Sequence, residues 1–278
     1  MQSLVNWIDR VDRRVIYALI FICLFIPLVR PIGMPVGISP TTQMAFDKIN
    51  SLKPGDIAIL SPDFTPGTEA ENLSQTVVFA HHLMSKGVRI IGLSMRPEGI
   101  MYAERVLTQL APEYGYEYGK DYVVMPWKAG GESLVVAFAK DFQGTYPEDF
   151  WGKPTKGTLV NDVKSINDVA VIICMVTGDE MQWYLRQVEA IYKVPVTGGG
   201  TAVTIPGLMP FVASGQLTGV LSGLKGAAEY EKLIGKPGRA AAGMDAQSLS
   251  HIIVMLFIIL GNVAHFYNKK KNKARRAN

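Results

Sequence analysis

The chain has 278 residues, of which 48% are hydrophobic, and a formal net charge of +4. That length allows one sizeable core together with membrane segments. Six basic residues crowd into the last ten positions and leave the rest close to neutral, which argues against a nucleic-acid partner. The two cysteines, Cys23 and Cys174, lie in apolar runs without Cys or His neighbours at metal-ligand spacing, so we predict neither a disulfide nor a metal site.

The first apolar segment is Val15–Val29, which three arginines precede. We interpret it as an uncleaved transmembrane helix over residues 15–36, after a cytoplasmic segment of residues 1–14. A cleaved signal peptide is the alternative, because a charged start and a short apolar stretch are its marks. Pro31, Gly33 and Pro35 follow in place of a small-residue cleavage site, which favours the anchor.

Residues 37–247 have the pattern of one α/β domain. Short β-rich runs alternate with segments of helical periodicity, as in βαβ units with a parallel sheet. The predicted strands are Asp56–Leu60, Arg89–Ser94, Tyr122–Met125, Val169–Val176, Pro195–Thr197 and Gly219–Leu221. The predicted helices are Thr41–Leu52, Glu69–Lys86, Gly99–Glu113, Glu132–Phe142, Asp179–Tyr192, Ile205–Ser214 and Leu224–Ile234. We therefore predict a doubly wound, Rossmann- or flavodoxin-like fold with a mostly parallel sheet of about six strands and one transmembrane helix at each terminus.

One stretch, Gln143–Asn167, departs from this rhythm and is rich in aromatic residues, proline and glycine. A loop of that length in a compact domain is usually functional or part of an interface. The alternative is a flap that covers one edge of the sheet, and the sequence does not choose between the two.

The second apolar segment, Leu249–Tyr267, is nearly long enough to cross the bilayer. We predict a transmembrane helix over residues 248–267 and a basic cytoplasmic tail over residues 268–278. By the positive-inside rule both termini are cytoplasmic, which makes the protein a two-pass protein of the cell (inner) membrane. The domain would then be extracytoplasmic, and periplasmic in a bacterium with an outer membrane.

Ligands of open parallel sheets bind beyond the carboxyl ends of the strands, so the loops there hold the candidate site. Two glycine-rich turns that open helices suit a small anionic ligand, because backbone N–H groups and the helix dipole attract negative charge. The predicted ligand-binding residues in these loops are Thr68, Arg96, Lys128, Gly130, Gly131, Ser133, Gly198, Gly199, Gly200 and Thr201. Neither turn matches a P-loop or a dinucleotide fingerprint.

Two carboxylates at the same edge, Asp63 and Asp179, are weak candidates for acid–base catalysis if the first and fourth strands are neighbours. Their alternative roles are structural, since Asp179 can cap a helix and Asp63 can form a turn. The sequence contains no nucleophile motif, so whether the protein is an enzyme stays open, and no cofactor is identified.

Two functions fit these features. The first is a membrane-anchored subunit or scaffold of a membrane complex, either with other membrane-protein subunits or as a homo-oligomer, that binds a small anionic ligand. The second is a membrane-tethered hydrolase or transferase acting on an anionic substrate. An enzyme should have its candidate side chains converging in one pocket, whereas a scaffold can have them dispersed or capping helices. We favour the first function.

Overall fold

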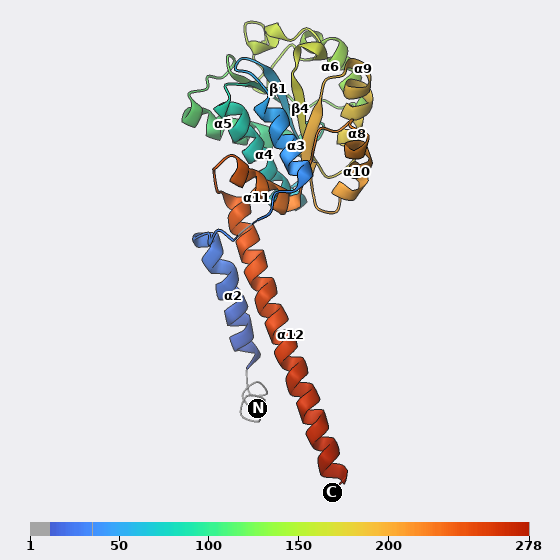
Figure 1. The fold of residues 1–278 in the computed structure, drawn as a ribbon. Helices are drawn as coiled ribbons and strands as arrows, with labels where there is room; N and C mark the ends of the chain where they lie inside the picture. Colours follow the sequence, from blue (N-terminus) through green and yellow to red (C-terminus); the bar gives the residue numbers. More distant parts are fainter. Residues whose placement is uncertain (1–11, 35, 278) are drawn as a thin grey trace. The chain divides into compact units, whose positions relative to one another are not determined.

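The computed structural model of the protein describes residues 12–34 and 36–277. The chain divides into two compact units. One unit is Val36–Ala240, which holds the sheet, and the other joins Met1–Pro35 with Ala241–Asn278. Figure 1 follows the chain through both units by colour.

The larger unit is built on a six-stranded parallel sheet. Its strands are β1 (Ile57–Asp63), β2 (Arg89–Gly92), β3 (Tyr122–Val124), β4 (Val171–Val176), β5 (Val196–Gly200) and β6 (Leu221–Ser222). They lie in the order β3-β2-β1-β4-β5-β6, and every neighbouring pair is parallel. The strand order reverses between β1 and β4, as in doubly wound folds. The predicted α/β fold with a mostly parallel sheet is therefore confirmed.

Helices cover both faces of this sheet. They are α3 (Pro40–Asn50), α4 (Glu69–Ser85), α5 (Pro97–Tyr114), α6 (Glu132–Lys140), α7 (Phe142–Thr145), α8 (Glu180–Tyr184), α9 (Ala190–Tyr192), α10 (Ile205–Ala213) and α11 (Gly223–Leu233). A π-helical turn, η4 (Leu185–Glu189), joins α8 to α9. Figure 1 shows α3, α4, α5 and α11 on one side of the sheet and α6, α8, α9 and α10 on the other. Strand alternation fills both cores, because Ile57 and Ile59 of β1 point to one face and Ala58 and Leu60 to the other.

The aromatic stretch Gln143–Asn167 covers the β3 edge of the sheet. The backbone N–H of Phe150 donates to the carbonyl oxygen of Val124 at 2.8 Å, and the N–H of Leu159 donates to Gly119 at 2.7 Å. These bonds occupy backbone groups that an edge strand would otherwise leave open to a foreign strand. The flap interpretation is therefore what the structure shows, although the same stretch also sends Tyr146 into the core.

The N-terminal apolar helix is shorter than the sequence indicated. We expected a transmembrane helix over residues 15–36, but α2 runs over Arg13–Val29 and has Pro27 in its last turn. Its 17 residues extend about 25 Å, less than the roughly 30 Å of bilayer hydrocarbon. The helix ends there because Arg30 has an extended backbone and Pro31 follows it. The prediction of two membrane-spanning helices is corrected accordingly.

The C-terminal apolar segment forms a helix of spanning length. Within α12 (Arg239–Ala277), the segment Arg239–Tyr267 is long enough to cross a membrane, and its most apolar stretch of 18 residues has a mean hydropathy of 2.0. It is the one segment of the described chain that meets this criterion. Only 6% of its most apolar stretch is buried within the protein, so the segment is not a core helix of this chain.

Candidate functional site

The switch point of the sheet lies where β1 and β4 run side by side. Asp63 at the end of β1 is in register with Val176 at the end of β4, so the loops that follow these strands meet at one edge. Polar side chains gather there on one face of the sheet. We call them the carboxyl-edge cluster: Ser61, Asp63, Ser94, Arg96, Tyr146, Cys174, Glu180 and Tyr184.

Asp63 is the centre of the cluster and is fully buried. Its Oδ2 accepts from Ser61 Oγ at 2.8 Å and from Cys174 Sγ at 3.0 Å. Its Oδ1 accepts from Ser94 Oγ at 2.9 Å and from the backbone N–H of Met95 at 2.5 Å. Burial raises the pKa of this carboxyl from 3.8 to about 7, although the hydrogen bonds from Cys174, Met95 and Ser61 oppose the rise. Asp63 can therefore hold or release a proton near neutral pH.

Strand geometry explains why these groups meet. Ser61 and Asp63 are two residues apart on β1 and thus point to the same face, and Cys174 lies opposite Ser61 on β4. Further down, the same face carries only apolar side chains such as Ile57 and Ile59. Burying a polar group costs free energy unless it forms hydrogen bonds. Packing alone therefore does not explain why this face of the sheet is polar at the carboxyl ends of the strands and apolar elsewhere.

The hydroxyls and the thiol of the cluster stay protonated at neutral pH. Burial raises the pKa of Tyr184 and of Cys174 well above their ordinary values, and nearby Asp63 adds to both shifts. Burial likewise raises the pKa of Tyr146, again with Asp63 contributing. The hydroxyl of Tyr184 shares a hydrogen bond of 2.8 Å with Ser61. Cys174 is consequently a hydrogen-bond donor here and not a thiolate nucleophile.

An ion pair borders the cluster. Arg96 Nη2 lies 2.6 Å from Glu180 Oε1, with the Arg96 side chain 31% exposed and that of Glu180 5% exposed. Both pack against Gly178, where an added β-carbon would lie 2.8 Å from Arg96 Nη2 and 3.0 Å from Glu180 Oε2. Glycine at this position leaves the pair room to approach the loop after β4.

Three buried polar atoms of the cluster have no hydrogen-bond partner among the described residues: Arg96 Nε, Tyr146 Oη and Glu180 Oε2. Buried polar atoms in native proteins are almost always partnered, by protein groups or by bound molecules. The three side chains lie around Asp63 near the switch point, where doubly wound folds bind ligands.

Of the residues predicted for catalysis, the structure brings only Asp63 into the cluster. Asp179 is exposed, and its carboxylate accepts from the side chain of Gln182 at 3.2 Å. It precedes α8 without capping it through its side chain. Among the described residues, the carboxylate that adds to the pKa rise of Asp63 is Glu180, the next residue along the chain.

The predicted anion-binding residues are dispersed. Arg96 belongs to the cluster, whereas the hydroxyl of Thr68 donates to the carbonyl of Thr65 at 3.1 Å. Lys128 Nζ donates to the carbonyl of Thr145 at 2.5 Å and lies 5.4 Å from the centre of the Tyr146 ring.

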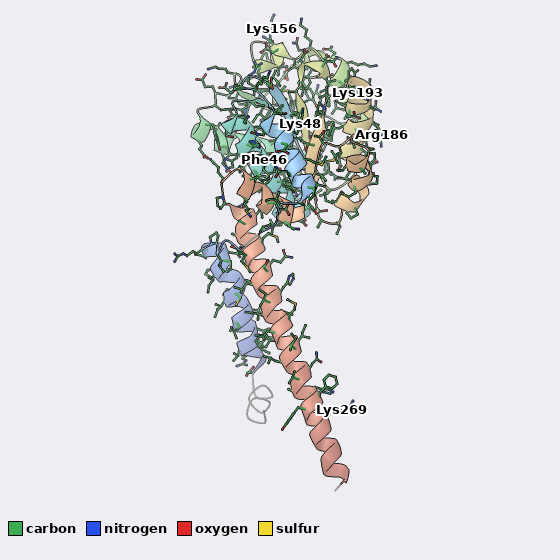
Figure 2. All side chains as sticks on the ribbon, in the orientation of Figure 1. Phe46, Lys48, Lys156, Arg186, Lys193 and Lys269 are labelled. Atoms are coloured by element: carbon green, nitrogen blue, oxygen red, sulfur yellow. The ribbon has the colours of Figure 1, made fainter. Side chains whose placement is uncertain are left out.

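The first glycine turn opens α6, as predicted. Gly130 and Gly131 have φ of 145° and 53°, and Ser133 is exposed in the first turn of the helix. Glu132 in that turn pairs with Arg186 at 2.8 Å, and Figure 2 labels Arg186 on the surface of the domain. The first turn of α6 thus already contains a carboxylate, that of Glu132, at the place where we predicted an anionic ligand.

The second glycine turn is not a loop. We expected Gly198–Gly200 to follow the fifth strand, but they form the end of β5 itself and are buried. A β-carbon on Gly198 would lie 1.9 Å from the carbonyl oxygen of Cys174, so only glycine permits this approach of β5 to β4. Gly200 accepts a hydrogen bond from Gln75 at 3.0 Å, and Thr201 shares one with Thr204 at 2.8 Å.

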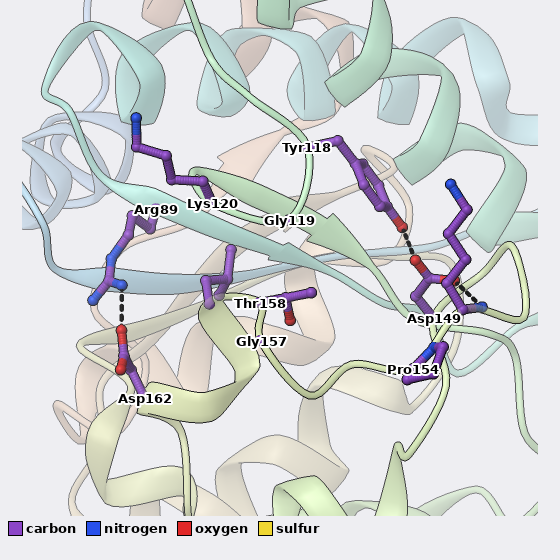
Figure 3. Close-up of a pocket in the computed structure, with 11 residues that line it drawn as sticks. Arg89, Tyr118, Gly119, Lys120, Asp149, Pro154, Gly157, Thr158 and Asp162 are labelled. Carbon is purple, nitrogen blue, oxygen red and sulfur yellow. Dashed lines mark hydrogen bonds and ion pairs between the residues drawn. The ribbon is translucent and has the colours of Figure 1, made fainter.

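An open pocket lies at the other end of the sheet, under the aromatic stretch (Figure 3). Its volume is about 480 Å³. Arg89 at the start of β2 pairs with Asp162 at 2.5 Å, and the hydroxyl of Tyr118 donates to Asp149 at 2.8 Å. Asp149 also accepts from the backbone N–H groups of Trp151 and Lys153, and we assign no function to this pocket.

The fold and the cluster define a doubly wound α/β domain with a polar site at its switch point, followed by a helix of membrane-spanning length. Among the described residues, no three His, Cys, Asp or Glu side chains are placed to hold a metal ion. The chain matches no described protein family and no curated protein. Among solved structures it is similar to the one described as the crystal structure of AibC, with 13% identity and a TM-score of 0.32. That match covers 81% of this chain and 49% of the other, and at this level it carries no functional argument.

Proposed function

We propose that this protein is a membrane-anchored α/β module that binds a small polar ligand at the carboxyl-edge cluster and acts as a subunit or scaffold of a membrane complex. The observation that carries the proposal is the set of three buried, unpartnered polar atoms around Asp63 at the switch point. Buried polar atoms normally have hydrogen-bond partners, and a ligand bound among these three atoms would provide them.

Attachment to the bilayer is supported by α12. Its apolar segment is almost wholly unburied, and an exposed surface of that size is stable only against lipid or another protein. Basic residues from Lys269 onward follow the segment directly. By the positive-inside rule we propose that this tail is cytoplasmic and that the domain is extracytoplasmic, at the cell (inner) membrane.

A contact within the smaller unit supports a joint role for its two apolar helices. The buried carboxylate of Asp245 accepts from the backbone N–H groups of Ile32 and Gly33 at 2.8 Å and of Met34 at 2.9 Å. These three residues follow α2, and Asp245 precedes the apolar stretch of α12. These hydrogen bonds hold the residues that follow α2 next to Asp245, just before the apolar stretch of α12 begins.

A membrane-tethered hydrolase or transferase is the second candidate function. The pKa of about 7 at Asp63 favours it, because a general acid or base works best when its pKa lies near the working pH. Against it, Asp179 and Lys128 do not join Asp63, and Cys174 is a protonated donor. The convergence expected of an active site is thus only partly met, and binding accounts for more of the geometry.

The test is to purify the full chain in mild detergent, denature it and identify what it releases by mass spectrometry. We expect a small molecule in stoichiometric amount from the wild type and its loss from Gly178→Ala, because a β-carbon there displaces Arg96 and Glu180. Gly207→Ala is the matched control, since a β-carbon at Gly207 meets nothing within 4 Å. Equal release from both variants would place the ligand elsewhere, and stoichiometric protein partners would support the assembly role.

A further inference from the structure

The helix α10 has an apolar outer face. Its buried residues, Ile205 and Leu208, face the core of the domain. On the outside, Met209 is 40% exposed, and Val203 in the loop before the helix is 88% exposed. The remaining exposed residues of this segment are Ala202, Pro206, Gly207, Pro210 and Ala213, and together with Val203 and Met209 they form what we call the α10 surface.

The α10 surface lies in a segment without charge. Residues 194–224 contain no Asp, Glu, Lys, Arg or His. Other exposed apolar residues of the domain lie among charges, as Ile191 does between Glu189 and Lys193. Single apolar residues in a charged surrounding are normal, whereas a contiguous uncharged apolar surface marks a site of interaction.

The loop that carries Val203 is fixed by hydrogen bonds. The backbone N–H of Ala202 donates to Glu71 Oε2 at 3.0 Å, and the hydroxyls of Thr201 and Thr204 share a bond of 2.8 Å. The N–H of Thr204 also donates to the carbonyl oxygen of Thr201 at 2.9 Å. The exposed valine is therefore held in place, and a preformed surface of this kind loses little conformational freedom when it binds.

Both ends of the larger unit are bound by α11. Lys232 Nζ donates to the carbonyl oxygen of Val36 at 2.9 Å, and the backbone N–H of Ala240 donates to Glu231 Oε1 at 3.0 Å. The first residue of α11, Gly223, packs against Ala202, since a β-carbon at Gly223 would lie 3.2 Å from that of Ala202. Figure 1 shows α10 and α11 at the same end of the larger unit. The α10 surface thus lies at the end of the domain where the chain continues into its two apolar helices.

Resting on the proposed attachment to the membrane, we infer that the α10 surface binds the lipid bilayer itself, with Val203 and Met209 inserted at the boundary between headgroups and acyl chains. A surface without charge suits this boundary, because no ionised group has to leave water. The domain then lies against the bilayer with this surface.

The size of the α10 surface argues against a second copy of the chain as its partner. A helix of 9 residues is about 14 Å long and about 10 Å wide. It supplies only a small part of the roughly 800 Å² that each partner contributes to a stable protein interface. Binding to lipid has no such minimum, because α12 already holds the chain at the bilayer.

The experiment uses the full chain in phosphatidylcholine vesicles, with a fluorescent label on Val203→Cys. Ile191→Cys is the matched control, because this residue is also exposed and apolar but lies among charges, and the wild type, whose two cysteines are buried, gives the background labelling. We expect nitroxide-labelled lipid to lower the fluorescence at position 203 about twofold or more, since interfacial side chains lie about 5–10 Å deep. The fluorescence at position 191 should not change.

A second substitution tests the surface as a whole. Met209→Asp in the chain labelled at position 203 should abolish the quenching, because a carboxylate does not enter the boundary region. Met101→Asp, which changes an exposed methionine on α5, should leave it unchanged. Thermal melting of each variant shows that it has folded.

The outcomes separate this inference from the proposed function. If alkaline carbonate extracts the wild type from the vesicles, the attachment to the membrane is refuted and the inference with it. If the chain stays in the vesicles but lipid does not quench the label at position 203, the inference alone is overturned. Quenching that depends on the number of chains per vesicle and not on nitroxide lipid would also overturn it, because a second copy would then cover the α10 surface.

Discussion

The buried carboxyl of Asp63 makes stability depend on pH in a way that one substitution should abolish. Its pKa is about 7 in the folded protein and 3.8 when the group is free in water. Because the folded state holds the proton more tightly, the contribution of this group to stability is greatest below pH 3.8 and is lost as the pH rises to about 7. At about 1.4 kcal/mol for each pKa unit, the loss amounts to about 4 kcal/mol.

Asp63→Asn should remove this dependence. Asparagine has the size of protonated aspartate and can still accept from the Met95 N–H, so the cluster keeps its shape without a titrating group. Relative to wild type, we expect the free energy of unfolding of the variant to rise by about 4 kcal/mol between pH 4 and pH 8. Denaturant unfolding of the full chain in detergent, followed by tryptophan fluorescence, measures the difference at each pH.

The matched control is Asp179→Asn, which changes an exposed aspartate at the same edge and should alter stability by no more than about 0.5 kcal/mol at any pH. Taking the difference between variant and wild type cancels the titration of all other groups. Curves for Asp63→Asn and wild type that run parallel from pH 4 to pH 8 would refute the reasoning, because the carboxyl would then be equally charged in the folded and unfolded states.

Two further predictions concern the backbone. Gly198→Ala should abolish folding or lower the melting temperature by more than about ten degrees, which corresponds to a loss of several kcal/mol, because the added β-carbon would clash with the carbonyl oxygen of Cys174. The control Gly207→Ala should melt within a few degrees of wild type, because its β-carbon meets no atom within 4 Å. Asp245→Ala should leave the backbone N–H groups of Ile32, Gly33 and Met34 without their acceptor. We therefore expect faster limited proteolysis of the residues between α2 and the domain. An unchanged cleavage rate would show that the Asp245 carboxylate does not hold these residues in place.

Most of the domain could be predicted from the sequence because its elements follow local rules. The central strands are uninterrupted apolar runs, and the helices between them have the spacing of one buried face. The end of β1 was missed because Ser61, Pro62 and Asp63 have the composition of a turn, yet all three extend the strand and are buried. They stay extended because they pair with β4, whose residues lie more than a hundred positions further along the chain.

The site was harder to predict than the fold. Asp63 and Arg96 could be found because they follow strands that are easily recognised. Glu180 could not be preferred over Asp179, since both begin the same helix and only the helix direction decides which one turns inward. Tyr146 reaches the cluster from the aromatic stretch, and no local pattern connects that stretch to the end of β1. The glycines of β5 were mistaken for a loop because the closeness of a neighbouring strand is invisible in the local sequence.

The energetic cost of the cluster is itself informative about its role. A domain is stable by only about 5–15 kcal/mol, so a buried acid that removes about 4 kcal/mol at neutral pH takes a large share of that stability. Leucine or valine at this position would pack against the apolar side chains of the same face and avoid the cost. A group with this burden that also lies beside unpartnered polar atoms at the switch point supports our proposal of a ligand site there.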